Sequence, residues 1–533
     1  MSCTTSPNPK TETYANDQEN QRLDFFCSKE SWTVFFWAAG ISSLVYLSYV
    51  VLPLYAIDDY FLYQLYQIDS STMGYNFYST GRFSQLILAD FFQLLNIQPL
   101  TKPIGPILFI LSLSYLSVIL SNAVDVKGFF LKLGFSLLVI LNPFMAELFH
   151  YSVIPAYSAF AMLSLTLGFV YGSRFAQCGS RLDLAFSIVM YAVSLSIYQI
   201  FYPIIFVFIL FQIAISYVDF TANKPNVIKQ QFKSLIPYFS AFIFYSVVLN
   251  TIFLFYPPSL TYSGTSFSDL IMNLTRHEYW SALNHNLEFY ILKDNPFNSF
   301  TLNSLMWVFF LFSLMVFTFT KIIQCKSWSS IKRPLIIIVV LILVNLLGLV
   351  GCLGFSILRP AEISSRSVTA FGVYQALTVI TSFYLLQYSG VLEKYRIGVS
   401  AVIIGILVLG SAGRIGRVAL DQYRLNSFDK SLATRIVTRL ESFPDFTPNA
   451  KLVILGAPTM GSLSRTSFGD YNISALQHFS RVFVINEISG YSFQNPNSDD
   501  IKSASMLVQD RTPWPNESSV ISNHGTFIVL LAK

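Results

Sequence analysis

Long uncharged apolar runs recur along almost the whole chain, and they limit its possible folds more than any other feature. Eleven runs approach the roughly 20 residues that a membrane-spanning helix needs. They lie approximately at 32–57, 103–121, 129–149, 154–171, 184–200, 201–218, 235–256, 301–323, 334–358, 368–388 and 397–412. Only 12% of the 533 residues are charged, against about a quarter in soluble proteins. The sequence predicts a polytopic α-helical membrane protein with about 11 transmembrane helices.

Basic residues are distributed unequally between the two sides of these runs. With the N-terminus in the cytoplasm, sixteen Lys and Arg residues fall on the cytoplasmic side and six on the other side. The six are Arg82, Lys102, Arg276, Lys293, Arg359 and Arg366. Because basic residues stay on the cytoplasmic side, this orientation is favoured. The net charge of +5 is then mostly a topology signal, and no nucleic-acid partner is expected.

This topology divides the chain into three parts. Residues 1–31 form a polar cytoplasmic tail, and residues 32–413 form the transmembrane domain with long outer loops at 58–102 and 257–300. Residues 414–533 lie outside and have an ordinary polar composition. We expect a helix at 431–443 and strands at 451–456, 481–487 and 526–533, and therefore a small α/β domain in the periplasm. Amphipathic helices are expected at 58–69 and 81–95 in the first loop.

Asp58 and Asp59 directly follow the first apolar run. They lie at the carbonyl end of the expected helix, where its dipole disfavours negative charge. One of them could cap the next helix, since Asp is a preferred N-cap residue. A cap needs a single Asp, so the other suggests chemistry. A carboxylate at the edge of an apolar region has a raised pKa and can act as a general base.

Two further positions place ionisable groups at outer ends of the runs. Arg82 follows Gly81 in the first outer loop. It either extends along the interface to reach water, or pairs with Asp58 or Asp59, or binds a phosphate. Glu147 and His150 end the third run, one helical turn apart. They form either a structural pair or part of a site, because ionisable residues there are costly unless they face a cavity or a partner.

Arg359, Glu362 and Arg366 occupy one short outer loop. Two arginines there run against the usual preference for basic residues on the inside. A bound anion would explain them. The alternative is an Arg–Glu pair on the surface.

These motifs together resemble a known family. The resemblance is carried by Asp58 and Asp59, by Gly81-Arg82, by Pro143 four residues before Glu147, and by Arg359-Pro360 followed by Arg366. In their order and topology they are similar to the bacterial O-antigen glucosyltransferases of the serotype-conversion type. The likeness covers roughly residues 58–366. It implies a GT-C type fold in the bacterial inner membrane, and a glucosyl transfer from undecaprenyl phosphate to the O-antigen of lipopolysaccharide on the periplasmic face.

The same resemblance implies roles for the candidate residues. Asp58 or Asp59 would be the catalytic base, and Glu147 would orient the acceptor or the acid. Arg82, Arg359 and Arg366 would bind the donor phosphate, and Tyr60, His150 and Glu362 are candidates for acceptor contacts. No cofactor or metal is expected; no cysteine spacing suggests a metal site. The alternatives are a transporter or flippase of lipid-linked sugars, and a GT-C transferase for another sugar or acceptor.

Overall fold

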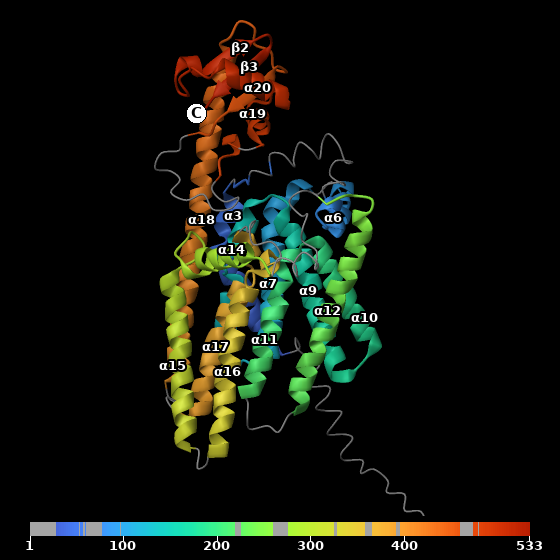
Figure 1. The fold of residues 1–533 in the computed structure, drawn as a ribbon, viewed down its shortest axis with the longest axis vertical. Coiled ribbons are helices and arrows are strands. Elements are labelled where there is room, and N and C mark those ends of the chain that lie inside the picture. Colours follow the sequence, from blue (N-terminus) through green and yellow to red (C-terminus); the bar gives the residue numbers. More distant parts are fainter. Residues whose placement is uncertain are drawn as a thin grey trace, which may run out of the picture.

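Long apolar helices stand side by side in a bundle, and a small domain rises beyond one end of it (Figure 1). The computed structural model describes residues 28–52, 54–56, 59, 77–95, 98–218, 225–258, 275–324, 328–357, 365–390, 395–458, 473–477 and 479–532. The bundle contains α2 (Lys29–Val45), α3 (Leu47–Val51), α7 (Gln98–Ala123), α8 (Phe129–Ile140), α9 (Ile154–Cys178), α10 (Arg181–Ile197), α11 (Pro203–Val218), α12 (Pro225–Phe253), α15 (Phe300–Gln324), α16 (Trp328–Gly351), α17 (Phe371–Ser389) and the first part of α18 (Arg396–Glu441).

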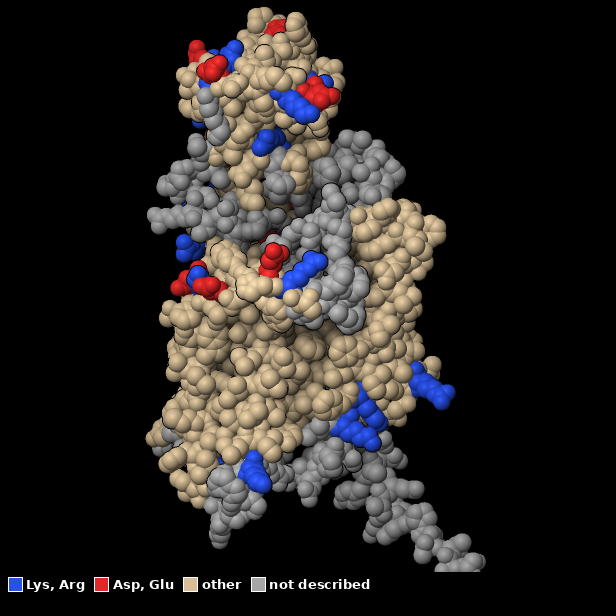
Figure 2. Space-filling view, viewed as in Figure 1, with Lys and Arg blue, Asp and Glu red and all other residues tan. Residues whose placement is uncertain are grey.

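The lateral surface of this bundle is apolar. Large side chains such as Phe244, Val308 and Val339 are more than half exposed there. Figure 2 shows on this face a broad band without charged residues, with Lys and Arg below it and both signs of charge above it. Such a surface suits a hydrocarbon environment rather than water. The chain is therefore a membrane protein.

Each of the eleven predicted runs overlaps a helix of the bundle. Among the described residues, seven helices are long and apolar enough to cross a membrane, or eight if the bent pair of α8 and η1 (Pro143–His150) counts as one span. The first run is divided at Tyr46 into α2 and α3. Eleven spans therefore remain a prediction, while a helical membrane fold is confirmed.

Short elements join the bundle helices. They include α6 (Phe83–Leu94), α14 (His277–Leu287), the π-helix η3 (Glu288–Leu292), and the 3-10 turns η2 (Gln199–Phe201), η4 (Gly354–Ile357) and η5 (Ser365–Ser367). Two of them, α6 and α14, lie toward the upper end of the bundle in Figure 1. The helix predicted at 81–95 is confirmed as α6, whereas the one predicted at 58–69 lies almost entirely outside the described residues.

The domain beyond the bundle is an α/β unit, as predicted. It comprises the last part of α18, β1 (Lys451–Leu455), η6 (Ala475–Gln477), α19 (Arg481–Ser489), α20 (Ser498–Leu507), η7 (Glu517–Ser519), β2 (Val520–Asn523) and β3 (Thr526–Leu530). The sheet order is β1-β3-β2, with β1 parallel and β2 antiparallel to β3. His524 and Gly525, both at positive φ, form the tight turn between β2 and β3.

Two local expectations for this domain need correction. The strand predicted at 481–487 is wrong, because these residues form α19, which ends at Gly490 in the left-handed conformation. Its apolar side chains Val482, Val484 and Ile485 are all buried in the domain core, so packing outweighs their β propensity. The helix predicted at 431–443 exists, but it is the end of the 46-residue helix α18.

Candidate active site

A bend in the third apolar run creates the centre of the candidate site. Pro143 has no N–H and restricts the residue before it to an extended conformation. Asn142 is accordingly extended, and α8 and η1 meet there at 50°. The Asn142 side chain accepts from the N–H of Phe144 at 3.3 Å and donates to the carbonyl of Thr369 at 2.9 Å. The bend turns η1, and Glu147 with it, away from the axis of α8.

Glu147 is buried and bound to the turn η5. Its Oε1 accepts from Nη1 of Arg366 at 2.9 Å, and its Oε2 accepts from the backbone N–H of Arg366 at 2.9 Å and from the hydroxyl of Ser365. The guanidinium also donates to the hydroxyl of Tyr151 and lies 5.2 Å from that ring. A buried carboxylate is tolerated only when it is paired and hydrogen-bonded in this way. The predicted residues Glu147 and Arg366 are thus brought together.

Asp59 binds the backbone just after η1. Its Oδ1 accepts from the N–H of Ser152 at 2.8 Å, and its Oδ2 accepts from the N–H of Ala56 at 3.0 Å. The residue is only 7% exposed. Burial raises the pKa of the Asp59 carboxyl above its usual range, although the charge of Lys102 and the two N–H groups act in the opposite direction. A carboxylate with a raised pKa is a better proton acceptor.

Lys102 also belongs to the candidate site, although the sequence motifs did not mark it. It is the fifth residue of α7, next to Pro103, and donates to the carbonyls of Leu54 and of His150, the latter at 2.8 Å. Its ammonium is 5.2 Å from the centre of the Tyr55 ring. Its one sequence signal was its place among the six basic residues of the outer loops. Which group it would face could not be read from that signal.

The residues from Glu147 to Ser152 connect these contacts. Glu147 and Tyr151 bind Arg366, the carbonyl of His150 accepts from Lys102, and the N–H of Ser152 binds Asp59. Acidic and basic groups from four separate parts of the chain therefore meet along six consecutive residues. The imidazole of His150 is buried and stacks on Tyr49, with ring centres 5.4 Å apart, so its proposed contact with an acceptor stays a prediction.

Arg82 occupies a neighbouring position. It precedes α6, and its guanidinium lies 4.8 Å from the centre of the Tyr198 ring, next to η2. The turn before it is fixed by Gly81, at a φ of 73°, whose carbonyl accepts from Tyr245 at 3.0 Å and Gln199 at 3.3 Å. The basic residue whose charge lowers the pKa of the Asp59 carboxyl is Lys102. Four further candidates, Asp58, Tyr60, Arg359 and Glu362, lie outside the described residues.

The arrangement contains the kinds of group that a group transfer can use, namely a carboxylate and an arginine. The segment from Glu147 to Ser152 connects the buried Asp59 carboxylate, whose pKa is raised, to a second carboxylate that binds an arginine. Comparison with curated proteins gives no match to this sequence. A family model described as glucosyl transferase GtrII matches residues 47–383, which is more than half of the chain and contains Asp59, Lys102, Glu147 and Arg366. The chain therefore belongs to the GtrII glucosyl transferase family.

Proposed function

We propose that this protein transfers a glucosyl residue from undecaprenyl-phosphate-glucose to the O-antigen of lipopolysaccharide at the periplasmic face of the inner membrane. The observation that carries the proposal is the buried Asp59 carboxylate, which is bound by the N–H of Ser152, five residues along the chain from the Glu147 that pairs with Arg366. A polyprenyl-phosphate donor presents its phosphate at the membrane interface, so the reacting groups must gather at a bundle end.

In the proposed reaction Asp59 accepts the proton of an acceptor hydroxyl. The hydroxyl oxygen forms a bond to the anomeric carbon of glucose, and the bond from that carbon to the phosphate oxygen breaks. The polyprenyl phosphate leaves with the electron pair and an added negative charge. Arg366, with Arg82 and Arg359, would stabilise this charge. Glu147 would fix the guanidinium of Arg366. Asp58 is the alternative base.

The proposed orientation places the N-terminus in the cytoplasm and the C-terminal domain in the periplasm. In support, the basic residues in Figure 2 below the uncharged band lie at the bundle end opposite this domain. Arg174, Arg181, Lys229 and Lys321 are among the basic residues at helix ends there. A reporter fused after Lys533 that is active only outside the cytoplasm tests this directly. If a reporter that is active only in the cytoplasm works at this position instead, the proposed orientation is wrong.

The function is tested by expressing the full chain in a bacterium that makes O-antigen and polyprenyl-phosphate glucose. We expect each O-antigen repeat to gain the mass of one hexose, and Asp59→Asn to abolish the gain while the protein still inserts. Asp90→Asn is the matched control, because Asp90 is an exposed carboxylate on α6 of the same outer loop. If the wild-type protein inserts well but adds no hexose, the proposed function is contradicted. Another sugar, another acceptor, or transport of lipid-linked sugars would then be the candidates.

A further inference from the structure

Helix α18 links the bundle to the C-terminal domain without a break. Its 46 residues correspond to a length of about 69 Å at 1.5 Å per residue, roughly twice the thickness of a bilayer core. The helix leaves the bundle beside α3 and continues into the domain at the top of Figure 1. All of α18 lies beyond residues 47–383, the stretch that the family model matches. Its contacts with the outer segments are therefore made by residues outside the family-matched stretch.

Two buried amide side chains of α18 bind the backbone of one residue near the site. Gln422 donates to the carbonyl of Tyr55 at 2.9 Å. Asn426 donates to the same carbonyl at 3.0 Å and accepts from the N–H of Tyr55 at 3.0 Å. Gln422 and Asn426 are four residues apart, so they share one face of the helix. Both polar groups of the Tyr55 backbone are thus held by α18.

The segment that α18 holds leads directly to the carboxylate. The N–H of Ala56, the residue after Tyr55, donates to Oδ2 of Asp59 at 3.0 Å. On the other side of Tyr55, the carbonyl of Leu54 accepts from Lys102. A shift of the Tyr55 backbone would therefore move a hydrogen-bond donor of Asp59 and an acceptor of Lys102 together.

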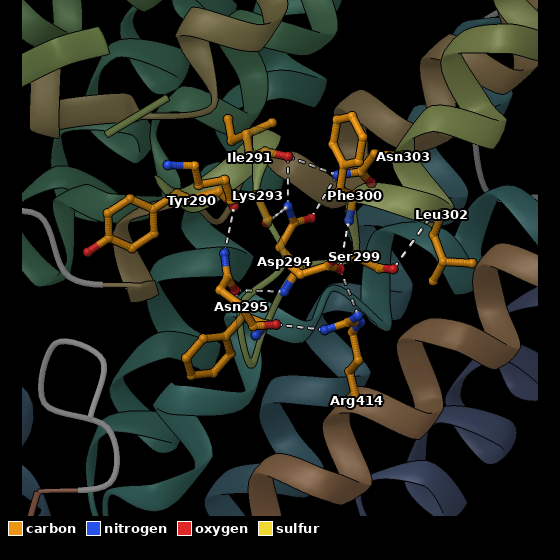
Figure 3. Close-up of polar contacts among 12 residues, drawn as sticks. Tyr290, Ile291, Lys293, Asp294, Asn295, Ser299, Phe300, Leu302, Asn303 and Arg414 are labelled. Atoms are coloured by element: carbon orange, nitrogen blue, oxygen red, sulfur yellow. Dashed lines mark hydrogen bonds and ion pairs between the residues drawn. The ribbon is translucent and has the colours of Figure 1, made fainter. Parts of the chain in front are cut away.

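The same helix holds a second outer segment. Figure 3 shows Arg414 reaching from α18 to residues 294–295, where Nη1 donates to the carbonyl of Asn295 at 2.6 Å and the guanidinium pairs with Asp294 at 3.6 Å. Phe297, two residues after Asn295, stacks on Phe144 of η1, with ring centres 5.8 Å apart. Helix α18 therefore contacts both the segment before Asp59 and the segment that packs on η1.

We propose that Gln422 and Asn426 are positioning residues for Asp59, and that the catalytic unit extends beyond the family-matched stretch into α18. This inference rests on the proposed role of Asp59. The two amides fix the backbone of Tyr55, and through the N–H of Ala56 they fix the orientation of the carboxylate toward the acceptor hydroxyl. Small misplacements of a reacting group reduce rates strongly, up to about a hundredfold for a shift on the order of 1 Å.

The test uses the full-length chain with Gln422→Ala, Asn426→Ala and the control Arg424→Ala, whose side chain is exposed on another face of the same turn. We expect the two positioning variants to lower kcat for hexose transfer about tenfold or more, with little change in the KM for the donor. The acid limb of their kcat–pH profile should also shift, because the N–H of Ala56 helps to set the pKa of Asp59. The control should match wild type.

A readout that is independent of activity separates this inference from the proposed function. Hydrogen exchange followed by mass spectrometry should show faster exchange in the peptide containing Tyr55 and Ala56 for Asn426→Ala, and unchanged exchange for Arg424→Ala. If wild type transfers no hexose but this exchange change is seen, the proposed function fails and the contact stands. Unchanged kcat in both variants, or equal losses in the control, would overturn the inference. Should Asn426→Ala fail to insert, Gln422→Ala decides, since it leaves both Asn426 bonds intact.

Discussion

Arg366 forms an ion pair with the buried carboxylate of Glu147, to which the arginine donates twice, from Nη1 to Oε1 and from its backbone N–H to Oε2, each at 2.9 Å. The two residues are 219 positions apart in the sequence. Their pairing joins η1, which ends the third apolar run, to η5, which precedes α17. A buried pair of this kind leaves an uncompensated charge when one partner is removed.

We predict that Glu147→Gln destabilises the protein and reduces transfer. The free energy of unfolding should fall by about 3 kcal/mol, the lower end of the range for breaking a buried pair, because a Gln oxygen can still accept one of the bonds. Thermal unfolding in detergent measures the first effect and hexose gain on O-antigen the second. Glu278→Gln, on the exposed side of α14, is the control. Wild-type stability and activity in Glu147→Gln would contradict this role.

The acid limb of the pH–rate profile should respond to Lys102. If Asp59 is the base, transfer falls as pH drops through its raised pKa, because the protonated carboxyl cannot accept a proton. The charge of Lys102 lowers that pKa, so Lys102→Met should move the acid limb to higher pH. The exposed Lys430→Met serves as a control. An acid limb that stays in place in Lys102→Met would show that a different group is titrating.

The same burial of Asp59 has an effect on stability whose sign is opposite to that of an ordinary salt-bridged aspartate. Its folded pKa is raised, so folding favours the protonated form. The associated stability is fully present below the unfolded pKa and is lost as pH rises through the folded pKa. Asp59→Asn should remove this dependence. The dependence is measured by comparing the unfolding midpoints of wild type and Asp59→Asn from below the unfolded pKa to above the folded pKa of Asp59. Parallel curves for the two proteins would contradict a raised pKa of Asp59 in the folded state.

Close contact between α17 and α8 depends on Gly372. A Cβ at this position would lie 2.8 Å from the carbonyl oxygen of Leu138 and 2.9 Å from that of Val139. Backbone atoms cannot move aside easily, so Gly372→Ala should destabilise the protein by about 1–3 kcal/mol. Gly398→Ala in α18 is a matched control, because nothing lies within 4 Å of its added Cβ. Unfolding of both variants in detergent tests the prediction; equal midpoints would show that the helices adjust.

The hairpin turn of the C-terminal domain should tolerate no branched residue at Gly525. This residue has a φ of 77°, which costs an L-amino acid about 1–2 kcal/mol. Gly525→Val should therefore expose the β2–β3 hairpin to hydrogen exchange while the bundle helices keep their protection. Gly490→Ala, also at positive φ but at the end of α19, provides a comparison within the same domain. Protection of β3 equal to wild type in Gly525→Val would rule out this dependence.

Long apolar runs and local turn signals were enough to predict most secondary structure here. The membrane helices, α6, β1 and β3 follow from periodicity and composition. The segment 481–487 did not follow, since its apolar residues fit a strand and a buried helix equally well, and only the core formed by α18 and the sheet selects the helix. Lys102 illustrates the same limit, because a single lysine before an apolar run gives no sign of its partners.

By itself, the sequence determined that this is a helical membrane protein with an α/β domain after its last span, because hydrophobic patterning acts locally along the chain. It also marked Asp59, Glu147 and Arg366 as unusual charges at span ends. Only the tertiary structure decided which groups come together: Glu147 pairs with Arg366, the charge of Lys102 acts on Asp59, and Gln422 and Asn426 bind the backbone of Tyr55. These partners are separated by tens to hundreds of residues, and the bend at Asn142 and the path of α18 bring them together.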